Sequence, residues 1–128
     1  MATDLYRSLV PMANSDLESL RDALREFARE RDWDLFHTPK NLAAALSVEA
    51  AELLEHFQWL TPGQSAELTS EARAGVREEL ADVLLYLIRL ADKLDVDLIE
   101  AAQAKLAINA RKYPADKARG NARKFSEL

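Results

Sequence analysis

The sequence predicts an all-α protein, a four-helix bundle-like protomer that assembles as a homo-oligomer. The 128 residues include only 3 Gly and 4 Pro, and 48% are apolar, so helix breakers are scarce and a core can form. Apolar residues recur at three- and four-residue intervals in separate segments, which is the spacing of amphipathic helices. The length is that of a single domain.

The first expected helix has a clear beginning. Ser15 and Glu18 have the spacing of a capping box, in which each side chain bonds the backbone of the other. The apolar stripe of this helix fades near Trp33 and consists of Leu17, Leu20, Leu24 and Phe27. Residues 1–14 precede the capping box and are expected to form a flexible N-terminal segment.

The second expected helix begins at Thr38 and Pro39. Threonine is a favoured N-cap, and proline is tolerated in a first turn because its missing N–H would have no helical partner there. The helical pattern continues to about Trp59. A break is expected at residues 61–64, where the sequence reads TPGQ.

The third expected helix runs from a cap at Ser70 to about Lys93. It is apolar over much of its surface, which indicates burial on several sides, and its apolar residues are Leu80, Val83, Leu84, Leu85, Leu87, Ile88 and Leu90. One layer of partners within a protomer cannot cover such a helix, so we expect a homo-oligomer. Asp95 or Asp97 caps the fourth helix, which ends before Pro114.

The domain organisation follows from these elements. Residues 15–114 are expected to form the helical domain, and residues 115–128 a basic C-terminal tail. Docking of the Phe125 side chain could hold this tail in place. The chain has no Cys, so disulfides and thiolate metal sites are excluded. No run of residues is apolar enough to span a bilayer and no signal-like segment begins the chain, so we expect no membrane association and a cytoplasmic protein.

The net charge of −5 is distributed unevenly. Residues 105–128 carry seven basic and two acidic side chains, whereas the other 104 residues carry ten basic and twenty acidic ones. An acidic body repels a phosphate backbone, so no nucleic-acid polymer is expected as a partner. A basic end beside an acidic body suits a small anionic ligand held through a cation.

Two pairs of carboxylates interrupt the apolar stripes of the two longest expected helices. Glu49 and Glu52 are three residues apart, which places them on one helix face. Glu79 and Asp82 repeat this spacing on the third helix. The stripe that Glu49 interrupts consists of Leu42, Leu46 and Leu53. If the two helices pack antiparallel, the four acids converge at their seam.

Four half-buried carboxylates cannot all stay ionised unaided, because desolvation and like charge both raise their pKa values. A divalent cation removes this conflict, and ligation by oxygen alone suits Mg²⁺, with Mn²⁺ as the alternative. Magnesium usually completes its shell with waters and substrate phosphates, so the pattern indicates chemistry on a nucleoside phosphate.

The acids have two other interpretations: a solvated helix face, which stays open, and a di-iron site, which loses support. Most Glu-x-x-Glu pairs lie on solvated helix faces, and a solvated face competes evenly with a metal site here. The solvated cases are expected to be Glu55, Glu71 and Glu78. A di-iron bundle would need Glu-x-x-His motifs, but the residues three before His37 and His56 are Asp34 and Leu53.

The acidic pairs, with 26 residues between Glu52 and Glu79, resemble the ExxE…ExxD signature of the all-α nucleoside triphosphate pyrophosphohydrolases, the MazG-like superfamily. Longer stretches are similar to its dCTP pyrophosphatase branch, and the similarity extends over roughly residues 17–128. These stretches are ERDWDLFHTPKNLAAALSVEAAELLEHFQW, EELADVLLYLIRLA and VDLIEAAQAKLAINARKYP.

The resemblance implies a homotetramer, a dimer of dimers, whose residues 15–114 are a MazG-like catalytic domain. It implies that Glu49, Glu52, Glu79 and Asp82 bind Mg²⁺ and catalyse hydrolysis of a dNTP between the α- and β-phosphates. The products would be a dNMP and pyrophosphate, with dCTP or a modified dCTP favoured, and the outcome would be nucleotide-pool sanitation. Glu49 or Glu52 would accept the proton of the attacking water.

The resemblance also implies which side chains hold the base and sugar. Trp33 and His37 match pocket positions, and Trp59 matches a second pocket aromatic. From the residues alone, a Trp at a helix end more often plugs the rim of a core, and His37 could be a plain loop residue. Asn41, in the first turn of the second helix, either contacts the substrate or serves only the cap.

Substrate contacts at the phosphate end are implied for Lys105, Asn109 and Tyr113, with Lys112 beside them and Asp82 also facing the substrate. Lys105, Asn109 and Lys112 are spaced to lie on one face of the fourth helix, where they could bind oxygens of the ligand. Late basic residues could instead only complement the helix dipole.

One position departs from the family pattern. Some members have His three residues before the Phe that matches Phe27, whereas this chain has Leu24. This puts strict dCTP selectivity in question. The alternatives to an enzyme are a non-catalytic helical oligomer, acting as a nucleotide-binding or protein-interaction module, and a structural bundle whose acids bind nothing.

Overall fold

The computed structural model describes residues 16–128. Helices make up all of its regular structure and no strand occurs in this range, which confirms the predicted all-α class. The expected N-terminal segment 1–14 and the Ser15 side of the capping box lie outside the described residues. The chain divides into two compact units, one ending at Asp95 and one running from Val96 to Leu128.

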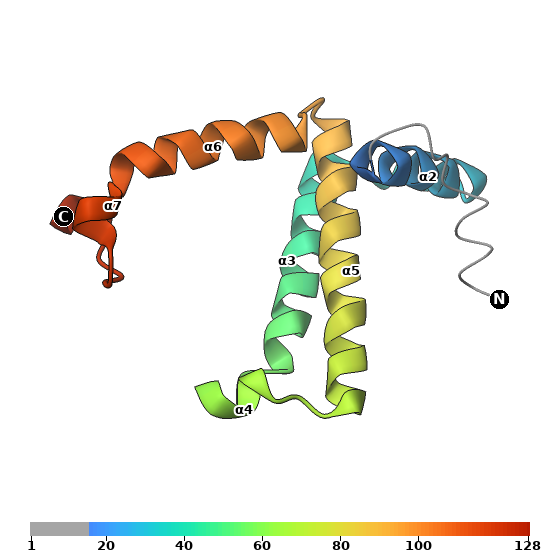
Figure 1. The fold of residues 1–128 in the computed structure, drawn as a ribbon. Coiled ribbons are helices and arrows are strands. Elements are labelled where there is room, and N and C mark those ends of the chain that lie inside the picture. Colours follow the sequence, from blue (N-terminus) through green and yellow to red (C-terminus); the bar gives the residue numbers. More distant parts are fainter. Residues whose placement is uncertain (1–15) are drawn as a thin grey trace. The chain divides into compact units, whose positions relative to one another are not determined.

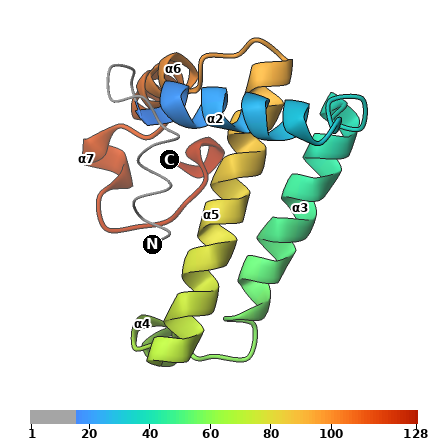
Figure 2. The ribbon, with the colours of Figure 1, turned by 90° about the vertical axis from the view of Figure 1, so that its right-hand side faces the viewer.

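The first unit contains the helices α2 (Asp16–Glu30), α3 (Pro39–Glu55), α4 (Pro62–Ala66) and α5 (Ser70–Lys93). Helices α3 and α5 lie side by side and run antiparallel, as both ribbon views show (Figures 1 and 2). The short helix α4 lies at one end of this pair. Helix α2 packs on α5 and crosses it near the other end (Figure 2).

Three threonines begin the later helices of this unit. The hydroxyl of Thr38 accepts from the backbone N–H of Asn41, as predicted, and Pro39 occupies the first turn of α3. Helix α5 is capped by Thr69, one residue before the predicted Ser70, because the Thr69 hydroxyl accepts from the N–H of Ala72. The predicted end of α5 at Lys93 is confirmed.

Two details between α3 and α5 differ from the prediction. Helix α3 ends at Glu55, four residues before the expected Trp59. Turns follow because the N–H of His56 bonds the carbonyl of Leu53 and the N–H of Phe57 bonds that of Leu54. The expected break at residues 61–64 is the start of α4. Thr61 and Gln64 form a capping box there, since each side chain bonds the backbone N–H of the other.

The core of the described residues is small. Its buried apolar side chains are Ala28, Leu42, Val76, Ile88 and Ala91. By contrast, α5 leaves Leu80, Leu84 and Leu87 between 37% and 53% exposed. The exposed apolar surface of this central helix favours assembly with other copies of the chain. The homo-oligomer itself stays a prediction.

The second unit contains α6 (Leu98–Lys112), α7 (Ala115–Ala118) and a 3₁₀ turn, η1 (Phe125–Glu127). Asp97, one of the two predicted caps, accepts from the N–H of Glu100. The ring of Phe125 meets that of Tyr113 edge-on, with centroids 6.3 Å apart, so Phe125 does dock the tail within this unit. The predicted domain limits, 15–114 and 115–128, stay predictions.

The described helices include none whose length and hydropathy would let it cross a membrane.

Leu42→Ala should lower the free energy of unfolding by about 2–5 kcal/mol, because the Leu42 side chain is only 1% exposed and its loss leaves a cavity in a small core. Urea unfolding measures this as a lower midpoint with an unchanged slope. The matched control is Leu35→Ala, whose side chain is 70% exposed and whose midpoint should barely move. Equal shifts in both variants would contradict the burial of Leu42.

Candidate active site

Three of the four predicted acids meet between α3 and α5. Glu49 comes from α3, while Glu79 and Asp82 come from α5, and one carboxylate oxygen of each lies within 4.8 Å of the others. All three side chains are half-buried. The antiparallel packing of α3 and α5 explains the meeting, because it brings the middle of each helix to the same level. The fourth acid, Glu52, lies one turn further along α3 and interacts with Glu49.

The cluster lacks counter-charge within the described residues. Glu49 Oε2 and Glu79 Oε2 are buried and have no hydrogen-bond partner. Ionised carboxylates only accept hydrogen bonds, so two of them can bond each other only when one holds a proton. The pKa of Glu49 is therefore raised to about 7, mainly because a protonated Glu49 can donate to the neighbouring Glu79 carboxylate, and then by burial and by Glu52.

A divalent cation fits this donor set. Carboxylate oxygens are the ligands that Mg²⁺ and Mn²⁺ prefer, and buried oxygens without a donor are the atoms that a cation would satisfy. Such a cation would also remove the repulsion that raises the pKa of Glu49.

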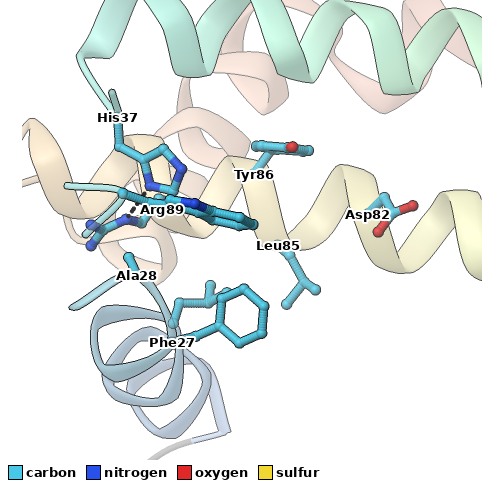
Figure 3. A pocket seen from close by; sticks show the side chains of 9 residues that line it. Phe27, Ala28, His37, Asp82, Leu85, Tyr86 and Arg89 are labelled. Atoms are coloured by element: carbon cyan, nitrogen blue, oxygen red, sulfur yellow. Dashed lines mark hydrogen bonds between the residues drawn. The ribbon is translucent and has the colours of Figure 1, made fainter. Parts of the chain in front are cut away.

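A pocket of about 220 Å³ lies beside the acids, bounded by α2, the 31–37 loop and α5 (Figure 3). Asp82 belongs both to the acid cluster and to the pocket wall. The remaining lining residues are Leu24, Phe27, Ala28, Trp33, His37, Leu85, Tyr86 and Arg89. The wall is mostly apolar or aromatic, with a few polar groups, which is typical of a site for a small organic ligand.

Aromatic contacts hold one side of this pocket. The ring of Trp33 meets Phe27 edge-on at 5.7 Å between centroids and lies 6.1 Å from His37. Trp33 is still 43% exposed, so a face of the indole remains available to a ligand. The predicted pocket residues Trp33 and His37 are thus brought together beside Asp82.

A buried arginine lies behind His37. Arg89 Nε donates to His37 Nδ1 at 3.2 Å, and the other guanidinium nitrogens pair with Asp34 and Asp92. The pKa of His37 is lowered, first by burial and then by the charges of Arg89 and Lys93. His37 is therefore neutral at physiological pH.

Two other predicted site residues of the first unit lie outside the pocket wall. The side chain of Asn41 donates to the carbonyl of Phe36 at 2.9 Å, which fastens the loop before α3. Trp59 is 87% exposed and belongs to the turns between α3 and α4. These turns lie at the end of the helix pair away from α2 (Figure 1).

The predicted phosphate-end residues all belong to the second unit. Lys105, Asn109 and Lys112 are on α6, and Tyr113 is its C-cap. The ammonium of Lys112 lies 4.9 Å from the centre of the Phe125 ring, and Tyr113 contacts the same ring.

Sequence reasoning missed Arg89 and the roles of Asp34 and Tyr86 in or behind the pocket. A signal was present for Arg89. It is the one charged residue between Val83 and Ala91, and a charge inside an apolar helical run has to find buried partners.

A model of the MazG-like family matches residues 44–128. Human dCTP pyrophosphatase 1 is 48% identical over 114 residues, which cover 88% of this chain and 67% of the human protein. The chain belongs to the MazG-like family. The predicted resemblance to the superfamily and to its dCTP pyrophosphatase branch is thereby confirmed.

Two further proteins are similar to this chain over most of its length. Bovine dCTP pyrophosphatase 1 is 46% identical over 115 residues, 88% of this chain and 68% of the bovine one. Among solved structures, a pyrophosphatase from Archaeoglobus fulgidus is 44% identical, with a TM-score of 0.75. The match covers 82% of this chain and 98% of the archaeal one, so the MazG-like fold assignment has structural support.

The raised pKa of Glu49 predicts a pH effect on the metal-free protein. Native Glu49 keeps its proton up to about pH 7, whereas its ordinary pKa is 4.5, so the native state binds more protons between these values. Its contribution to stability is therefore lost as pH rises through this interval. Glu49→Gln cannot lose a proton, so its melting temperature should rise relative to wild type between pH 5 and 8 in EDTA.

Differential scanning calorimetry of both proteins measures this difference. The matched control is Glu55→Gln, an exposed position on the same helix, whose melting temperature should keep a constant offset from wild type. A constant offset for Glu49→Gln as well would contradict the crowding of the acids.

Proposed function

We propose that this chain is a Mg²⁺-dependent nucleoside triphosphate pyrophosphohydrolase that converts a dNTP to a dNMP and pyrophosphate. The relatives named dCTP pyrophosphatase 1, at 46–48% identity, support the enzyme class. The substrate favoured by the relationship is dCTP or a modified dCTP. The consequence for the cell would be nucleotide-pool sanitation, in the cytoplasm.

The position of Asp82 carries the proposal. Asp82 is shared by the acid cluster and the pocket, so a ligand whose base lies in the pocket can extend its phosphates toward Glu49 and Glu79. A nucleotide has this division into an aromatic base and an anionic phosphate chain. Trp33 supplies a stacking face, and His37 supplies a polar group for the base edge.

Glu49, Glu79 and Asp82 would hold the Mg²⁺, with Glu52 as the fourth acid, and Mn²⁺ would be accepted in its place. The orphaned oxygens of Glu49 and Glu79 support this ligand set. When bound, the cation supplies Lewis-acid polarisation of the phosphoryl group and lowers the pKa of bound water from its bulk value of about 15.7.

The side chains then have separate roles in the reaction. Glu49 or Glu52 accepts the proton of the attacking water, whose oxygen bonds to the α-phosphorus. The bond from that phosphorus to the bridging oxygen breaks, and pyrophosphate leaves with both electrons of the bond. Leu24, Phe27 and Leu85 keep water away from the base.

The second unit is proposed to serve the phosphate chain. Lys105, Asn109, Lys112 and Tyr113 match the family run KLAINARKYP, and their charges and donors would offset the negative charge that pyrophosphate acquires. Asn41 is also proposed at the substrate, although its amide is engaged with the loop before α3.

The assembly is proposed to be a homotetramer, a dimer of dimers. Two observations support further copies of the chain: the exposed leucines of α5, and the 87% exposure of Trp59 away from the pocket of its own unit. Trp59 would then be the second pocket aromatic by completing a site of another copy. Neither a nucleic-acid polymer nor a membrane is proposed as a partner, since the body of the chain is acidic.

The catalytic test uses purified protein, Mg²⁺ and a panel of dNTPs. Wild type should release pyrophosphate and not orthophosphate, and reaction in H₂¹⁸O should put the label into the dNMP. Glu79→Gln and Asp82→Asn should each lower kcat by at least about 100-fold, because each removes charge that the cation site needs.

The matched control is Glu78→Gln, which alters the exposed neighbour of Glu79 and should keep wild-type turnover. Circular dichroism checks that helix content is retained. Normal hydrolysis by both cluster variants would contradict the metal-site assignment. Binding of dNTP without turnover in wild type would favour the alternative, a non-catalytic nucleotide-binding oligomer.

Trp33→Ala should weaken binding of the preferred dNTP by about 5- to 150-fold, because stacking on a base contributes roughly 1–3 kcal/mol. The effect should appear in KM more than in kcat, since Trp33 contacts the base and not the phosphates. Trp33→Phe retains a stacking face and is the matched control. Equal KM values for Trp33→Ala and wild type would place the base elsewhere.

A further inference from the structure

The guanidinium of Arg89 uses each of its three nitrogens on a different partner. One terminal nitrogen pairs with Asp34, the other lies 3.6 Å from Asp92, and Nε donates to His37 Nδ1 at 3.2 Å. The Arg89 side chain is only 5% exposed, so water has little access to its guanidinium. Figure 3 shows the bond between Arg89 and His37 at the back of the pocket.

This arrangement determines which nitrogen of His37 carries the proton. A guanidinium only donates hydrogen bonds and stays protonated in proteins. The nitrogen that accepts from Arg89 must therefore present a lone pair, which means that Nδ1 is unprotonated. In the neutral ring the single proton is then on Nε2.

We propose that Arg89 is a positioning residue that fixes His37 as the Nε2–H tautomer, so that the pocket offers one hydrogen-bond donor to an acceptor on the base edge. This inference rests on the proposed function for the identity of the ligand, but the tautomer does not depend on it. In Figure 3 the second ring nitrogen of His37 lies on the side turned from Arg89 toward Tyr86.

A fixed Nε2–H tautomer would select bases by the chemical group that they place opposite His37. An Nε2–H donor pairs with a carbonyl oxygen or an unprotonated ring nitrogen, whereas an exocyclic amine facing it would leave two donors opposed. Burial of such a mismatch is costly, so the site would discriminate against it. Without Arg89 the ring could carry its proton on either nitrogen, and this discrimination would weaken.

Removing Arg89 should leave the fold intact, because neither carboxylate loses its last partner. Asp34 still accepts from Lys93 at 2.9 Å, and Asp92 still accepts from Arg25 Nε at 2.8 Å. Arg89→Met keeps most of the length and the apolar stem of the side chain while removing every donor. The matched control is Lys93→Met, which removes a positive charge from Asp34 but leaves the donor to His37 in place.

The first measurement is ¹⁵N NMR of the imidazoles in the full-length, ligand-free protein at neutral pH. The chain has two histidines, and His56, whose ring lies against Gly75, serves as the internal reference. We expect His37 Nδ1 to resonate as an unprotonated nitrogen in wild type and in Lys93→Met. In Arg89→Met the two nitrogens should approach each other in shift as the tautomers exchange. A protonated Nδ1 in wild type, or an unchanged spectrum in Arg89→Met, would overturn the proposal.

The second measurement is kinetic and uses the preferred dNTP. Arg89→Met should raise KM by about 2- to 10-fold with little change in kcat, because one directed hydrogen bond to the base is lost. The groups that act on His37 are Arg89 and Lys93, which lower its pKa, and Asp34, which raises it. Loss of Arg89 should therefore raise the pKa of His37 and move the acid limb of kcat/KM to higher pH.

The two measurements separate the claims. An unchanged KM and pH profile in Arg89→Met, despite a changed spectrum, would overturn the role of the donor in base recognition. Absence of hydrolysis by wild type would contradict the proposed function, while the wild-type and Arg89→Met spectra would still decide whether Arg89 fixes the tautomer.

Discussion

The repulsion among carboxylates at the seam of α3 and α5 is the constraint on which the rest of the structure depends. Glu49, Glu79 and Asp82 are brought within 4.8 Å of one another by two antiparallel helices, and two of their buried oxygens have no donor. A chain that only needed stability would place leucines there. The seam therefore stores an unfavourable interaction that a cation and a phosphate chain can relieve, which links its architecture to chemistry.

Charge is balanced in the wall of the pocket beside the seam, whereas it is unbalanced in the acid cluster. The one buried cation of this wall is surrounded by groups that offset its charge. Arg89 is surrounded by Asp34, Asp92 and a neutral His37, so it adds little net charge to the wall. The base-binding side is thus apolar and nearly neutral, while the adjoining acid cluster is strongly charged. Asp82 is the residue where the two environments meet, and this polarity matches that of a nucleotide.

Much of the local structure could be predicted because its causes are local. The Thr38–Pro39 start of α3 and the end of α5 at Lys93 follow from capping chemistry and apolar periodicity. The pairing of the acids followed from a three-residue spacing. The predicted end of α3 near Trp59 was wrong, because the helix ends at Glu55 and the apolar pattern continues through turns formed by hydrogen bonds within residues 53–58.

The sequence by itself determined the helical class, the two acidic pairs and the family, since each depends on residues close together along the chain or on a pattern of whole segments. Only the tertiary structure decided that three acids share one cluster, that Asp82 also borders the pocket, and that Arg89 lies behind His37. The physical reason is that hydrogen bonds and charge pairs act over a few ångströms. Arg89 and His37 are 52 residues apart along the chain, so only the folded chain brings them within that range.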